Sequence, residues 1–99
     1  YERIIEQDGA DAVSLNNLAW LLATAEDKDL RDVGRALKLA RRAVSLERSS
    51  MYLDTLAEAY YANGLTEEAA ETIREAIAAA KENRPYYERQ LKRFQGSHP

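Results

Sequence analysis

The chain has 99 residues and a formal net charge of −3, with 45% hydrophobic and 31% charged residues, four glycines, two prolines and no cysteine. This length corresponds to one domain or to part of a longer array, and the shortage of glycine and proline favours helices. The absence of cysteine excludes disulfides, thiol nucleophiles and cysteine-ligated zinc. We therefore expect an all-α fold.

Six helices are predicted along the chain from apolar periodicity and stop signals. Asp32 and Thr66 are expected to cap the helices that follow them, and Pro85 suits a first helical position. Gly64 suits the left-handed end of a helix. Because a helix is already expected at Tyr1, the chain is expected to be a piece of a longer protein. The expected helices are 1–8, 12–25, 32–47, 50–63, 66–82 and 85–95, followed by a frayed tail at 96–99.

The charge is spread evenly and does not form the strongly basic surface that is typical of nucleic-acid-binding domains. No apolar stretch approaches the roughly 20 residues needed to cross a bilayer. We expect a soluble chain that neither binds nucleic acid nor inserts into a membrane, and its compartment stays open. One basic group near the C-terminus is expected to be solvated and to complement a helix dipole. It consists of Arg84, Arg89, Lys92 and Arg93.

The small and apolar residues of one expected helical hairpin recur in the next. Matching positions lie 38 residues apart in the first helices and 33 apart in the second, which places five additional residues in the first turn, within "TAEDKDLRDVG". Alanine at such positions lets helix backbones approach closely, and the larger residues fill the volume between hairpins. The matched pairs are Leu15 and Leu53, Leu18 and Leu56, Ala19 and Ala57, Leu22 and Tyr60, Ala36 and Ala69, Ala40 and Ile73, and Ala43 and Ala76. Tyr87, Leu91 and Phe94 continue the series 34 residues after Leu53, Ala57 and Tyr60.

This pattern resembles the tetratricopeptide repeat, a helix–turn–helix unit of 34 residues. It departs from the family pattern at Leu53, Ala57 and Lys81, where tryptophan, glycine and proline are usual. The resemblance implies a single domain over 1–95, built as a right-handed α-α superhelix of helical hairpins. Its segments are the tail of a preceding repeat at 1–9, a repeat with an extended turn of a form found in many bacterial members at 12–49, a repeat at 50–83, and a following or capping helix at 85–95.

Catalytic and metal sites find little support in the sequence. His98 is the single histidine and lies in the C-terminal tail, where we expect it to be solvated. The carboxylates between residues 67 and 75 form a stripe of the kind that usually faces water. Asp27, Asp29 and Asp32 lack the glycine and glutamate of a calcium loop. We expect no enzymatic activity, no cofactor and no metal.

The resemblance implies a partner-binding groove, because the first helix of each hairpin lines the concave surface of tetratricopeptide arrays. Trp20 is a candidate apolar anchor, but it is equally compatible with packing against a preceding helix or the inserted turn, and Tyr61 has the same ambiguity. Asn17 matches a position where some peptide-binding members carry an asparagine that bonds the ligand backbone. The expected partner-binding residues are Val13, Asn16, Asn17, Trp20, Met51, Asp54, Thr55, Glu58, Tyr61 and Ala62, with Glu88, Arg89 and Lys92 beyond them.

Two acids set the expected charge of this groove. Asp54 and Glu58 lie four residues apart on one helix face, so they should favour basic or neutral segments. Family members that clamp the C-terminal carboxylate of chaperones use lysine and arginine at positions that here hold Asn16, Trp20, Asp54 and Thr55, which disfavours that ligand. We therefore expect a protein or peptide partner of another kind.

Two alternative functions stay open. The chain is also compatible with a structural segment of a longer superhelix that self-associates weakly through exposed apolar ends, at Tyr1, Ile4, Tyr87 and Phe94. A further alternative is an accessory array of a larger enzyme, since some glycosyltransferases carry such repeats, and only flanking sequence could show it.

Overall fold

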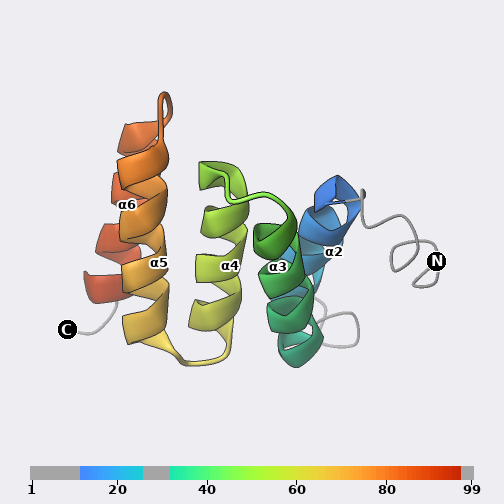
Figure 1. The fold of residues 1–99 in the computed structure, drawn as a ribbon. Helices are drawn as coiled ribbons and strands as arrows, with labels where there is room; N and C mark the ends of the chain where they lie inside the picture. The colour runs from blue at the N-terminus through green and yellow to red at the C-terminus, as the bar shows by residue number, and fades with distance from the viewer. Residues whose placement is uncertain (1–11, 26–31, 97–99) are drawn as a thin grey trace.

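The computed structural model describes residues 12–25 and 32–96, which form five α-helices and no strand (Figure 1). The all-α prediction is confirmed for this part of the chain. The helix expected at 1–8, the inserted turn with Asp27 and Asp29, and the tail with His98 lie outside the described residues. The helices are α2 (Ala12–Thr24), α3 (Val33–Leu46), α4 (Ser50–Ala62), α5 (Thr66–Ala79) and α6 (Arg84–Gly96).

Consecutive helices pack against one another and follow each other in a row (Figure 1). Helix α2 also contacts α4, although α3 lies between them in the sequence. Side chains of α6 reach α4 as well, through a hydrogen bond from Tyr86 to Asp54 and an ion pair between Arg93 and Glu58. The helices α2, α4 and α6 therefore share one face. None of the described helices is long and apolar enough to span a bilayer.

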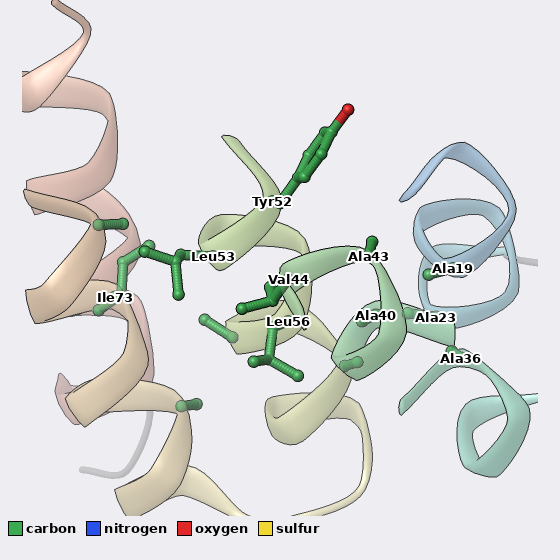
Figure 2. Close-up of a cluster of buried hydrophobic side chains, with 14 of the residues drawn as sticks. Ala19, Ala23, Ala36, Ala40, Ala43, Val44, Tyr52, Leu53, Leu56 and Ile73 are labelled. Atoms are coloured by element: carbon green, nitrogen blue, oxygen red, sulfur yellow. The ribbon is translucent and has the colours of Figure 1, made fainter. Parts of the chain in front are cut away.

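Small residues set the spacing of the helices. Ala19 of α2 and Ala36 and Ala40 of α3 are almost fully buried and belong to one core cluster, and the missing side-chain bulk lets the two backbones approach (Figure 2). Between α4 and α5 the core uses larger residues, and Leu53 and Ile73 lie beside each other there. Burying one such aliphatic side chain contributes roughly 1.5–3 kcal/mol.

Gly64 ends α4 as predicted. Its φ of 81° lies in the left-handed region that glycine adopts without strain. Its N–H donates to the carbonyl of Tyr61 at 3.0 Å, and the N–H of Leu65 donates to the carbonyl of Tyr60 at 2.9 Å, which is the Schellman pattern. Asn63 adds a bond between hairpins, because its side-chain amide donates to the carbonyl of Val33 at 2.8 Å. The end of α4 is therefore fixed to the start of α3.

The cap predictions are met at one of two positions. The carboxylate of Asp32 accepts the N–H of Arg35 at 3.2 Å and caps α3. The expected cap at Thr66 is wrong, since Thr66 is the first residue of α5 and Leu65 occupies the cap position without a side-chain bond. The reason is that Leu65 closes α4 and opens α5 at once: its carbonyl accepts the N–H of Ala69 at 3.0 Å.

Helix α5 ends at Ala79, three residues before the expected end at 82. Ala80 already has extended backbone angles, and Asn83 has a φ of 63° in the left-handed region, which asparagine tolerates better than most residues. The carbonyl of Asn83 then accepts the N–H of Tyr86 at 3.0 Å and starts α6. The chain thus reverses direction over 80–83, and Pro85 is the second residue of α6 instead of the first.

Candidate functional site

Three adjoining hollows follow the face that α2, α4 and α6 share. The Asp54 hollow, about 520 Å³, lies in the middle, and the Arg93 hollow, about 590 Å³, and the Val13 hollow, about 420 Å³, lie on either side of it. Trp20 and Tyr86 line both the Asp54 and the Arg93 hollows. Asn16 and Met51 line both the Asp54 and the Val13 hollows. We call the three hollows together the groove.

The groove is lined by all ten residues that were predicted to contact a partner. They come from two helices. Within each helix they are mostly three or four residues apart, a spacing that places side chains on one helix face. On α2 they are Val13, Asn16, Asn17 and Trp20, and on α4 they are Met51, Asp54, Thr55, Glu58, Tyr61 and Ala62.

The ten residues differ in how much of each is free to touch a partner. Val13 and Met51 are 59% and 60% exposed, and Asn17 is also exposed, so these form the rim. Trp20, Tyr61 and Ala62 are half-buried. The remaining four are buried and form the floor of the groove: Asn16, Asp54, Thr55 and Glu58.

The Arg93 hollow is held together by a charged and aromatic cluster. The guanidinium of Arg93 forms an ion pair with Glu58 and lies 5.0 Å from the ring centres of both Tyr61 and Phe94. The Arg93 Nε also donates to the side chain of Gln90 at 3.0 Å. Arg93 is exposed in the last turn of α6, as the sequence suggested, but its guanidinium is also paired with Glu58. Its charge neutralises Glu58, so the acidity expected from two carboxylates is confined to Asp54.

The Asp54 hollow holds a buried carboxylate that is only half satisfied. Its Oδ2 accepts the hydroxyl proton of Tyr86 at 3.3 Å, and its Oδ1 is buried without a partner among the described residues. Burial raises the pKa of Asp54 from 3.8 to about 6; the Tyr86 hydrogen bond opposes that rise, nearby Glu58 adds to it, and Arg93 opposes it. The Oδ1 of Asn16 is buried and unpaired in the same way. The floor of this hollow thus contains two acceptors that are unpaired and buried.

Helix α6 and the turn before it contribute side chains to the groove that the sequence analysis missed. Asn83 of the turn and Tyr86 and Tyr87 of α6 line the Asp54 hollow, and Gln90 and Arg93 of α6 line the Arg93 hollow. The spacing of Tyr86, Gln90 and Arg93 at i, i+4 and i+7 is a signal that could have found them. Among the three α6 residues that were named, Arg89 lines the Arg93 hollow, whereas Glu88 and Lys92 are exposed and line none of the three hollows.

The arrangement offers shape, aromatic surface and hydrogen-bond acceptors. Within residues 12–25 and 32–96, no group of three or more histidine and acidic side chains is placed to hold a metal ion. Comparison of the chain with models of protein families, with curated proteins and with solved structures finds no match. The resemblance to tetratricopeptide repeats therefore stays a prediction.

Proposed function

We propose that the chain is a non-catalytic module of the tetratricopeptide type that binds a peptide segment of a partner protein in the groove. The observation that carries the proposal is that ten residues chosen from the repeat pattern line one continuous row of hollows across two helices. Helices that pack in succession, with α2, α4 and α6 on a common face, also support the right-handed superhelix that the resemblance implies.

The chemistry of the groove suits a polypeptide. Trp20 stands between two hollows and is half-buried, so its ring offers apolar surface to a side chain that enters either one. Asn17 lies exposed at the rim of the Asp54 hollow, where its amide offers both a donor and an acceptor to a peptide backbone. Apolar anchoring at Trp20 and backbone bonding at Asn17 would together hold an extended or helical segment.

Selection of a random peptide library on the chain tests this function. A selected peptide should bind the parent chain and lose affinity when Trp20 and Asn17 are both replaced by alanine, with helicity checked by circular dichroism. Peptides that bind the doubly substituted chain equally well would reject the site.

The self-association alternative loses part of its basis. Tyr87 and Phe94 were expected to be exposed at the C-terminal end, but they are 6% and 1% exposed and belong to the core of the chain itself. Tyr1 and Ile4 lie outside the described residues. Sedimentation over a range of concentrations separates the two functions, because a chain that stays monomeric removes self-association and leaves peptide binding in place.

A further inference from the structure

Two buried side chains from different helices line the Asp54 hollow, and each has an acceptor atom without a donor among the described residues. Asn16 on α2 and Asp54 on α4 are each 6% exposed, and the Oδ1 atom of each has no hydrogen-bond partner among the described residues. Both side chains line the same hollow. Burial of an unpaired acceptor is costly, so polar groups in protein interiors are nearly always paired. A pair of free acceptors in one hollow therefore points to a ligand that carries several donors.

The surroundings of these acceptors favour a cation. Asp54 is the single ionisable acid or base among the residues that line the Asp54 hollow, apart from two tyrosines. Two bases, Arg89 and Arg93, line the neighbouring Arg93 hollow, and Arg93 is paired there with Glu58. The walls include the aromatic rings of Trp20 and Tyr86, and aromatic faces attract cations. The hollow thus joins one carboxylate, with no basic residue in the same lining, to aromatic walls.

We propose that the Asp54 hollow binds the guanidinium group of an arginine side chain in the partner peptide, with Asp54 Oδ1 and Asn16 Oδ1 as its acceptors once a small side-chain rotation turns each of these buried atoms toward the ligand. This inference rests on the proposed function and adds the residue type that the groove selects. A guanidinium has five N–H donors in a planar fork, so one group can serve acceptors that come from two helices. It is more weakly hydrated than an ammonium and stacks on aromatic rings, which suits a buried hollow walled by Trp20. The Tyr86 hydroxyl holds Asp54 Oδ2 and leaves Oδ1 for the ligand.

The test uses the 99-residue chain and small probes, followed by nuclear magnetic resonance at neutral pH. Nα-acetyl-arginine amide is expected to shift the side-chain amide signals of Asn16 and the indole signal of Trp20. The citrulline derivative has nearly the same shape and no charge, and we expect it to bind at least about tenfold more weakly, because charge-assisted bonds are about twice as strong as neutral ones. The lysine derivative should also bind more weakly than the arginine derivative.

Matched variants show whether the arginine derivative binds in the Asp54 hollow. Asp54→Asn keeps the shape of the side chain, removes its charge, and should weaken arginine binding about tenfold. Glu68→Gln removes the same charge from the exposed start of α5, away from the groove, and should leave binding unchanged. Equal binding of arginine and citrulline, or undiminished binding by Asp54→Asn, would overturn the inference. Equal binding of the lysine and arginine derivatives would reject the preference for a guanidinium group over an ammonium group.

The outcome separates this inference from the proposed function. The arginine probe needs only the Asp54 hollow, whereas a selected peptide needs the length of the groove. Peptides that bind the groove while the arginine probe does not would remove the inference alone. An arginine probe that binds while no selected peptide contacts the groove would remove the proposed function and leave the hollow as a cation site.

Discussion

The hydroxyl of Tyr86 on α6 donates a hydrogen bond to Asp54 Oδ2 on α4 over 3.3 Å. This bond joins two helices that are separated in sequence by the whole of α5, and it fixes one oxygen of a buried carboxylate. The other oxygen, Asp54 Oδ1, has no partner among the described residues. The ionised Asp54 carboxylate therefore lowers the stability of the chain without a ligand, and this loss of stability can be measured.

Asp54→Asn is expected to raise the free energy of unfolding at neutral pH. Burial lifts the pKa of Asp54 from 3.8 to about 6, and at about 1.4 kcal/mol per tenfold change in the dissociation constant the ionised carboxylate costs up to roughly 3 kcal/mol. Asparagine keeps an acceptor for Tyr86 and carries no charge. Chemical denaturation followed by circular dichroism measures the change, with Glu68→Gln as a control for loss of one exposed negative charge. A less stable Asp54→Asn chain at neutral pH would contradict the prediction.

The stability difference between the parent chain and Asp54→Asn should depend on pH. Because the pKa of Asp54 is higher in the folded chain than in the unfolded chain, its contribution is fully favourable below about 3.8 and is lost as pH rises through about 6. The groups that set this pKa are Tyr86, Glu58 and Arg93, and comparison at each pH cancels most other titrations. Melting curves of both chains should differ least near pH 4 and most near pH 7. A difference that is constant over this range would show that Asp54 does not titrate there.

Binding of the arginine probe should follow the same ionisation. The guanidinium needs the negative carboxylate. Its affinity should therefore fall as pH drops through about 6, the pKa of Asp54 in the folded chain without a ligand. Bound cation should also move the apparent pKa of Asp54 downward. Titration of Nα-acetyl-arginine amide at several pH values measures both effects. Affinity that stays constant between pH 5 and pH 7 would mean that Asp54 is not the acceptor.

Arg93→Met is expected to destabilise the chain. Glu58 is only 7% exposed and pairs with Arg93, so removal of the arginine leaves a buried carboxylate without its counter-charge. Since the Arg93 side chain is 45% exposed, the loss should fall below that of a fully buried pair, at about 1–3 kcal/mol. Adding Glu58→Gln to the same chain should restore part of the stability. A double variant as unstable as the two single losses combined would show that the pair is not coupled.

Two glycines should respond to alanine in opposite directions. Gly64 has a φ of 81° and no atom within 4 Å of the position where a Cβ would lie, so Gly64→Ala should cost about 1–2 kcal/mol through backbone strain alone. Gly34 lies in the first turn of α3 with the same free space, and Gly34→Ala should stabilise the chain by up to about 1 kcal/mol. Thermal unfolding of the two variants gives the comparison. A Gly64→Ala chain as stable as the parent would reject this account of the end of α4, and a loss of stability in Gly34→Ala would reject the account of the start of α3.

Local sequence signals predicted the helices well, because periodicity and caps act within a few residues. Helices α2, α3, α4 and α6 begin and end within one residue of their predicted limits, and Gly64 and Asp32 act as expected. The end of α5 was missed because the stop signals, Asn83 and Pro85, lie several residues after Ala79, where the helix ends. The turn depends on Asn83 in a left-handed conformation, which a sequence pattern does not reveal.

The floor and charge of the groove depend on packing, which periodicity does not describe. The pattern placed Asp54 and Glu58 on the correct face, but it could not show that Arg93 neutralises one and that the other is buried. These outcomes depend on where α6 places Tyr86 and Arg93 relative to α4. The residues of the rim, where Asn17 and Met51 lie exposed, could be predicted from helical spacing alone.

The central claim is that the groove of α2, α4 and α6 binds polypeptide, and the most direct test is to map a library-selected peptide onto the isotope-labelled chain by nuclear magnetic resonance. The account predicts the largest shifts at Asn17, Trp20 and Tyr86, and a loss of affinity of at least about tenfold for Trp20→Ala. Leu21→Ala removes a side chain that is 53% exposed on the same helix and lines none of the three hollows, so it should leave affinity unchanged. Shifts confined to α3 and α5, or full affinity in Trp20→Ala, would contradict the claim.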